Sequence, residues 1–224
     1  GSGAALPIDL GRGVLNRMVA AGVDPLDLDR FLLTHLHADH SGELVALLFA
    51  LRHGRAEPRS VELHGPRGLD DLVRRIVEAW PSTKPDYPLT VLETEGGLVI
   101  DELVRVRAEP VHHGGHAALG FRIEDATTGR CMAFTGDSGP GPALSRLSDG
   151  VDLLVAECAD GPGPGRGRHL DVDALVELAD ASQVGRVAVV HIDPRHDRAA
   201  VLGELARRLG DRLIEGRDGL RIAV

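Results

Sequence analysis

Six consecutive residues contain four side chains that can bind a metal ion. The stretch is His35-Leu36-His37-Ala38-Asp39-His40, and it follows an apolar run at 31–33. On an extended segment, residues two apart point the same way, so His35 and His37 can converge on one point. If the chain then turns into a helix, Asp39 and His40 reach a second point nearby, as in a two-metal site. A polar loop after a buried strand is the alternative, but four N and O ligands so close together favour a metal site.

Further candidate ligands follow apolar runs later in the chain. The pair His112 and His113 comes after Val111, Asp137 ends the run Thr135-Gly136-Asp137, and His191 follows two valines. A site on the rim of a sheet collects side chains from the ends of several strands. Together with the first stretch, these residues make two ligand sets that share one carboxylate.

The periodicity of apolar residues predicts the elements that position these ligands. A strand at 30–34 precedes the first stretch, and leucines at helical spacing predict an amphipathic helix at 41–53. From 89 to 137 the period changes to two, which predicts a strand meander with a hairpin turn at 128–129. Strands and helices then alternate: helix 171–182, strand 187–190, helix 199–209 and strand 220–224. This mixed order predicts an α/β fold in which sheets pack on each other with helices outside.

Length and composition favour one cytoplasmic domain. The 224 residues are 43% hydrophobic, which is enough to bury a large core, and we expect a single domain over 1–224. No apolar run approaches the roughly 20 residues of a membrane span, and the N-terminus lacks the regions of a signal peptide. Cys131 and Cys158 lie in apolar, strand-like runs, so we expect both to be free core residues.

The motif from Thr34 to Gly42 resembles the signature of the metallo-β-lactamase-fold hydrolases. The downstream ligands follow in that family's order, and the likeness extends from Ile8-Asp9 to His191. The resemblance implies an α/β fold of four layers, an αββα sandwich. Members usually begin with one or two strands and a Gly-rich loop before the segment that matches 6–10. Only residues 1–5 stand there, so we expect the first sheet to be incomplete.

Carried over residue by residue, the resemblance implies a binuclear metal site. One metal would be held by His35, His37 and His113, the second by Asp39, His40 and His191, with Asp137 bridging them. The family pattern Val-x-His-Gly favours His113 as the ligand, although His112 and His116 are close competitors. Two divalent ions are expected, with zinc first and Mn, Fe or Ni as alternatives for the same ligands.

Within this superfamily the chain resembles the ribonuclease Z-like branch. The likeness includes Gly65-Pro66, Ala156-Glu157, the Gly-Arg-His169 segment and the residues at 191–195. In that branch, residues matching Glu157 and His169 form a pair beside the metals, and the histidine helps to protonate the leaving group. The expected catalytic residues are therefore Asp39, His169 and Glu157. Alternatively, Glu157 orients a metal-binding histidine and His169 merely precedes the helix N-cap Asp171.

One departure from this branch concerns the substrate. Members that process tRNA carry a long arm between the segments matching 121–123 and 135–137, whereas here only a short turn at 124–130 joins them. The formal net charge of −9 also argues against a broad nucleic-acid surface. We therefore expect a small-molecule, ester-like substrate rather than nucleic acid, and no membrane partner. The family resemblance leaves a homodimer open.

The predicted function is that of a binuclear metal-dependent hydrolase. Two cations about 3.5 Å apart lower the pKa of a shared water, and the resulting hydroxide attacks an ester-like substrate such as a phosphodiester. The alternatives are a ribonuclease Z-like RNA endonuclease without the arm, an iron-dependent oxidoreductase on the same fold, or a non-catalytic metal-binding protein. The loop at 161–168 is either a mobile flap whose Arg166 and Arg168 bind an anionic substrate or an ordinary solvent loop. Arg195 either binds substrate or pairs with a carboxylate.

Overall fold

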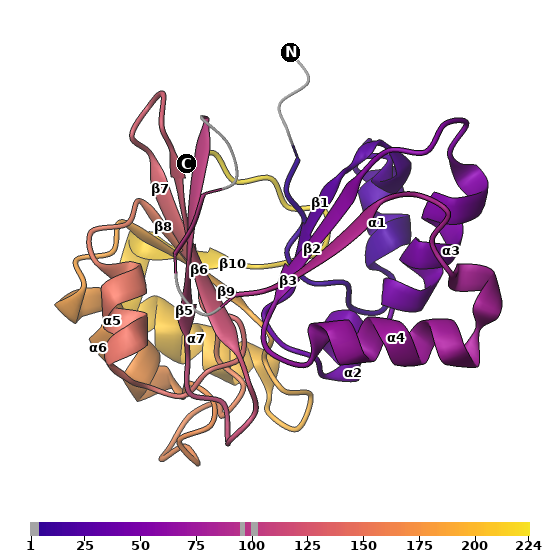
Figure 1. Cartoon of the computed structure of the whole chain (residues 1–224). Helices are drawn as coiled ribbons and strands as arrows, with labels where there is room; N and C mark the ends of the chain where they lie inside the picture. The colour runs from indigo at the N-terminus through magenta and orange to yellow at the C-terminus, as the bar shows by residue number, and fades with distance from the viewer. Residues whose placement is uncertain (1–4, 95–96, 100–102) are drawn as a thin grey trace. The chain divides into compact units, whose positions relative to one another are not determined.

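The computed structural model describes residues 5–94, 97–99 and 103–224. They form two units, Gly1–Thr94 and Glu95–Val224, each with its own sheet and its own core (Figure 1). The expectation of a single domain over the whole chain stays a prediction. None of the helices in the described ranges is long and apolar enough to cross a membrane.

The first unit contains a small parallel sheet with helices on one side (Figure 1). Its strands, in spatial order, are β1 (Arg30–Leu32), β2 (Val61–Gly65) and β3 (Leu89–Glu93). Its helices are α1 (Val14–Ala20), α2 (Ala38–Ser41), α3 (Leu44–Gly54) and α4 (Leu69–Ala79), with short 3-10 helices η1 (Pro25–Asp27) and η2 (Pro81–Thr83). Ahead of these, Ile8 forms an isolated bridge to Leu32 rather than a strand.

The core of the first unit lies between the sheet and helices α3 and α4. Alternate strand residues such as Phe31 and Leu63 meet the apolar stripes of these helices. The stripes consist of Leu44, Leu47, Leu48, Leu51, Leu69, Val73 and Ile76. The helix predicted at 41–53 is therefore present, but it starts at Leu44, and residues 38–41 form the separate short helix α2.

The second unit is built on a seven-stranded mixed sheet. The strand order is β10-β9-β8-β7-β6-β5-β4, parallel from β7 to β10 and antiparallel from β4 to β7. The strands are β4 (Gly97–Val99), β5 (Val104–Pro110), β6 (Leu119–Asp125), β7 (Cys131–Phe134), β8 (Leu153–Glu157), β9 (Arg186–Val190) and β10 (Leu213–Glu215). The helices are α5 (Pro142–Ser148), α6 (Val172–Ala181) and α7 (Arg198–Leu209), followed by the 3-10 helix η3 (Gly210–Arg212).

All three α-helices of the second unit pack on one face of its sheet (Figure 1). On β8, Leu154 and Ala156 belong to the core that these helices complete. Because side chains alternate along a strand, Glu157 points to the opposite face. The sheet face that carries no helices therefore holds the buried Glu157 carboxylate. The two units together confirm the α/β class that the sequence predicts.

The structure corrects three expectations. β3 pairs with β2 in the first sheet, so the meander comprises β4 to β7 rather than everything from 89 to 137. Residues 220–224 are not a strand, because the place beside β9 is taken by β10. Helix α5 was not expected, since it has only seven residues and begins at Pro142, directly after the Gly-Pro-Gly stretch at 139–141. The helices predicted at 171–182 and 199–209 are confirmed as α6 and α7.

Cys131 and Cys158 are free and buried in the core of the second unit, as expected. Their reactivity tests how this core is packed. Burial raises the pKa of the Cys158 thiol to about 12 and also raises the pKa of Cys131. Because the thiolate is the reactive form, we expect neither cysteine to react with Ellman's reagent in the native protein at pH 8. Both should react at once in guanidinium chloride. A fast-reacting thiol in the native protein would contradict this packing.

Candidate metal centre

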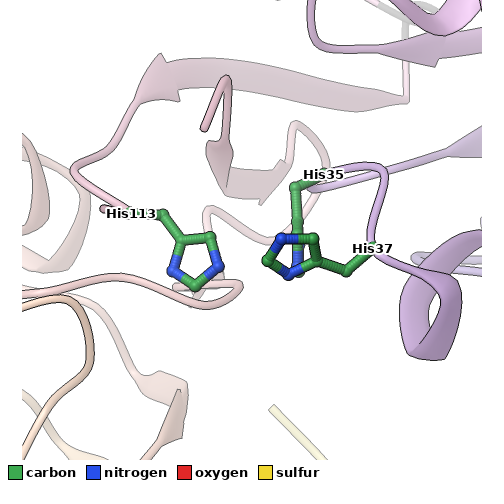
Figure 2. A group of neighbouring side chains, drawn as sticks. All are labelled: His35, His37 and His113. Atoms are coloured by element: carbon green, nitrogen blue, oxygen red, sulfur yellow. The ribbon is translucent and has the colours of Figure 1, made fainter. Parts of the chain in front are cut away.

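The first ligand cluster, His35, His37, Asp39 and His40, lies where β1 ends and α2 begins. Figure 2 shows His35 and His37 on the loop that joins these elements. Their ring centroids are 4.6 Å apart with the rings edge to face, and the centroids of His35 and His40 are 4.1 Å apart. The His40 Nε2 atom is 3.8 Å from the Asp39 Oδ2 atom. The extended segment and the helical turn thus bring these four residues together within the first unit.

A buried carboxylate, Asp9, fixes the orientation of this cluster. Its Oδ1 atom accepts a hydrogen bond of 2.7 Å from the Thr34 backbone N–H. Its Oδ2 atom accepts one of 2.8 Å from the Thr34 hydroxyl and one of 2.7 Å from His40 Nδ1. The Thr34 hydroxyl gives its only proton to Asp9, so it must accept its 3.0 Å bond from His35 Nδ1. In both imidazoles, Nε2 is therefore the nitrogen that could bind a metal.

Asp9 reaches this position through an unusual backbone path. Its φ is +65°, and its N–H donates to the Leu32 carbonyl over 2.8 Å. The next residue, Leu10, donates to the His40 carbonyl, and a Cβ on Gly11 would lie 2.1 Å from the Asp39 carbonyl oxygen. The sequence analysis did not identify Asp9 as a site residue. The available signal was an acidic residue within the apolar segment at 6–10, which Gly11 follows directly.

The second ligand cluster lies in the second unit and comprises His113, Asp137, Glu157, His169 and His191. Three of its members follow strand ends: His113 after β5, Asp137 after β7 and His191 after β9. Glu157 is the last residue of β8, and His169 comes just before α6. Strands β7, β8 and β9 are parallel, and β5 runs in the same direction because both β5 and β7 are antiparallel to β6. Their carboxyl ends therefore meet at one edge of the sheet.

Within this cluster the possible ligand atoms are close enough to share a metal ion. Those of His113, Asp137 and His169 lie within 4.8 Å of one another, and so do those of Glu157, His169 and His191. The distance from His191 Nε2 to Asp137 Oδ2 is 3.5 Å.

The structure distinguishes His113 from its neighbouring histidines. His113, labelled in Figure 2, is buried, and its Nδ1 atom lies 3.2 Å from the Arg168 carbonyl oxygen, which only an N–H can approach as a donor. The nitrogen that His113 could offer to a metal is then Nε2. The competing residues His112 and His116 are exposed, and neither belongs to a possible ligand group among the described residues.

The buried Glu157 and the half-buried His169 form a pair beside Asp137. Glu157 Oε1 accepts 2.8 Å and 2.7 Å hydrogen bonds from His169 Nδ1 and the Ser138 backbone N–H, and Oε2 accepts one of 2.9 Å from Ala159. Burial raises the pKa of Glu157, and the hydrogen bond to Glu157 raises the pKa of His169. His169 therefore keeps its proton to a higher pH than an ordinary imidazole, which suits a proton donor.

The connection between β6 and β7 is a tight turn, as the sequence predicted. Asp125 Oδ1 accepts hydrogen bonds from the N–H groups of Thr127 and Thr128, and Gly129 adopts a φ of +70°. No arm is inserted between these two strands.

The three hydrogen bonds to Asp9 predict a large effect on stability. In Asp9→Ala, three donors, two on Thr34 and one on His40, lose their acceptor in a buried site. We expect the free energy of unfolding, measured by urea titration of the metal-free protein, to fall by about 3 kcal/mol. Asp24→Ala is the matched control, because Asp24 is exposed and caps only η1; its loss should cost about 0.5–1 kcal/mol. Equal losses in the two variants would contradict the assigned role of Asp9.

Comparison with known proteins agrees with this geometry. Residues 11–192 match the family described as Beta-lactamase superfamily domain. A Ribonuclease Z from Brevibacillus brevis is 27% identical over 241 aligned residues, which cover 84% of this chain and 76% of that protein. A Ribonuclease Z from Mycobacterium marinum is 33% identical over 168 aligned residues, covering 68% of this chain. The match spans only 60% of that mycobacterial relative's length.

A solved structure shows the same fold. The metallo-beta-lactamase fold protein YhfI from Bacillus subtilis superposes with a TM-score of 0.79 at 16% sequence identity, covering 95% of this chain and 84% of that one. The likeness supports the α/β class of the metallo-β-lactamase fold that the sequence predicts, and each unit by itself has one sheet and one set of helices. The chain belongs to the Beta-lactamase superfamily domain family, on the ribonuclease Z-like branch of the metal-dependent hydrolases with the metallo-β-lactamase fold.

Proposed function

We propose that this protein is a phosphodiesterase that uses two divalent metal ions. One ion would be held by His35, His37 and His113, the other by Asp39, His40 and His191, with Asp137 shared between them. The proposal rests on how the candidate histidine ligands are oriented by hydrogen bonds within each unit. The Nδ1 atoms of His35, His40 and His113 are engaged by fixed hydrogen-bond partners, as is usual for metal-binding histidines.

The donor set fits the proposed ions. Imidazole nitrogens with a few carboxylate oxygens are the ligands that zinc prefers, and Mn, Fe and Ni accept similar sets. Asp137 is buried in the second cluster, close to His191, as a shared carboxylate would be. When bound, such ions activate water at neutral pH and neutralise charge that develops on the phosphoryl oxygens.

The chain's own residues would handle the leaving group. His169 is in place to give a proton to a departing alkoxide, because Glu157 holds its Nδ1–H and leaves Nε2 to act. Glu157 also accepts the Ser138 N–H, so the same carboxylate positions the segment that follows Asp137. Asp39 would contribute as a ligand whose side chain lies at the exposed start of α2.

The comparisons alter one expectation about the substrate. Both relatives described above are named Ribonuclease Z, which weighs against the view that nucleic acid is not a partner. The short turn between β6 and β7 and the net charge of −9 still favour a small phosphodiester over a folded tRNA. Cleavage of RNA without an arm is the second candidate function, supported by the names of those relatives.

Removal of metal tests the proposal directly. Dialysis against a chelator should abolish hydrolysis of bis(4-nitrophenyl) phosphate and of the dinucleotide UpU, and addition of Zn²⁺ or Mn²⁺ should restore both. Metal analysis should find about two equivalents per chain. His191→Ala should bind about one equivalent, whereas the control His53→Ala, an exposed histidine on α3, should keep both.

Three results would contradict or redirect this assignment. Full activity in the chelated protein would exclude the metal mechanism. Efficient cleavage of a precursor tRNA, with no activity on small diesters, would establish the ribonuclease alternative. Iron in the purified protein together with O₂ consumption would point to an oxidoreductase.

The role of His169 predicts a dependence on the leaving group. A 4-nitrophenolate leaves without a proton, but the ribose alkoxide of UpU requires one. We therefore expect His169→Ala to lower kcat on UpU by about 10²-fold or more and kcat on bis(4-nitrophenyl) phosphate by less than about tenfold. Glu157→Gln should show the same selectivity to a smaller degree. The glutamine amide can still accept the hydrogen bond from the His169 ring, but it does not stabilise the positive charge of that ring. Equal losses on both substrates would make His169 a structural residue.

A further inference from the structure

The loop at 161–168, between β8 and α6, is held in place by hydrogen bonds from its backbone N–H groups to two carboxylates. The Gly165 N–H donates to Asp171 Oδ2 over 2.8 Å, and the Arg166 N–H donates to Asp160 Oδ2 over 2.7 Å. Gly161 forms an isolated bridge with Asp171. Two carboxylates at the base of the loop thus anchor its middle.

Close contacts between glycines and their neighbours join the same loop to the second ligand cluster. A Cβ on Gly139 would lie 1.9 Å from the Gly167 carbonyl oxygen, so the segment after Asp137 touches the loop directly. A Cβ on Gly114 would lie 2.4 Å from Cδ of Arg168, whose carbonyl accepts the bond from His113. These contacts argue against the mobile flap considered from the sequence and make the loop a fixed wall of the cluster.

This wall carries two guanidinium groups that form no ion pair within the described residues. Most arginines of the second unit form ion pairs, among them Arg130, Arg146 and Arg208. By contrast, the guanidinium groups of Arg166 and Arg168 have no carboxylate partner in the described parts of the chain. Both residues lie within three positions of His169.

A cavity runs along the loop on the Arg166 side. Its volume is about 240 Å³, and its lining includes Asp160, Arg166, Arg195 and His196. Asp193 holds Arg195 through two contacts of 2.7 Å and 3.0 Å, which compensates the charge of that guanidinium. The Asp160 carboxylate is already used by the Arg166 N–H. Arg166 is therefore the guanidinium of this cavity that has no ion pair within the described residues, although the charged Asp160 carboxylate lines the cavity as well. Arg168 lies outside this cavity, against Gly114 and next to His113.

We propose that Arg166 and Arg168 form a subsite for a second phosphate group of the substrate, next to the phosphodiester that is cleaved. The inference rests on the proposed function and narrows its substrate class to diesters with a neighbouring phosphate. Guanidinium groups bind phosphate oxygens through paired hydrogen bonds. Because the loop backbone is already held by its glycine contacts, little backbone entropy is lost when the anion binds, and the ordering cost is that of the two arginine side chains.

The test compares two dinucleotides with the same cleavable bond, UpU and its 5′-phosphorylated form pUpU. In the wild-type protein, KM for pUpU should be about tenfold lower than KM for UpU, equivalent to about 1.4 kcal/mol. The double variant Arg166→Ala/Arg168→Ala should show no preference, and the Lys/Lys variant should regain part of it. Arg217→Ala is the control, since Arg217 is also exposed and without an ion pair in the described residues, and it should keep the full preference.

Calorimetric titration of pUpU into the chelated protein gives a readout that is independent of turnover. Wild type and Arg217→Ala should bind pUpU more tightly than UpU, and the double alanine variant should bind both alike. If neither dinucleotide is cleaved, the proposed function fails. If both are cleaved and bound equally well by the wild type, the function stands and the subsite is refuted. A preference for pUpU over UpU that persists in the double alanine variant also refutes the subsite.

Discussion

The carboxylate of Asp9 is the group on which the first ligand cluster depends. It lies in a segment before α1, yet it accepts hydrogen bonds from Thr34 at the end of β1 and from His40 in α2. Two flexible imidazoles are thereby set to one tautomer each before any ligand arrives. Each bond is buried, so its loss would leave a donor without solvent as well as without a partner. A small number of polar contacts thus determines where nitrogen lone pairs point.

The second cluster depends on strand direction instead. Four strands that run the same way end at one edge, and each ends at or just before a residue with a ligating or acid–base side chain. The alternation along β8 places Ala156 in the core and Glu157 on the helix-free face. His191 adopts a φ of +48°, so its backbone leaves the line of β9 immediately. The chemistry is therefore positioned by ordinary sheet geometry, and positive φ angles occur only after the strands end, as at Gly114, Gly136 and His191.

Features encoded by neighbouring residues were predictable, and features that depend on distant pairing were not. Helix α6 follows from apolar spacing and the Asp171 cap, both of which are local. β3 has the same period-two pattern as the meander strands, but its partner is β2, about 28 residues earlier in sequence, and no periodicity specifies that choice. The ligand stretch was evident because its members are adjacent. The role of Asp9 was not, because its partners lie 25 and 31 residues away.

The single bridge between Ile8 and Leu32 has a thermodynamic consequence for the first unit. The segment that carries Asp9 is held by four main-chain hydrogen bonds, two to Leu32 and one each to His40 and Glu43. It must be docked for His40 to be correctly oriented. If His40 binds a metal as proposed, metal binding and docking of residues 7–10 would be linked equilibria, and each would stabilise the other. The entropy of ordering this segment would then be part of the free energy of metal binding, so metal affinity would be set partly by a stretch of chain that supplies none of the proposed metal ligands.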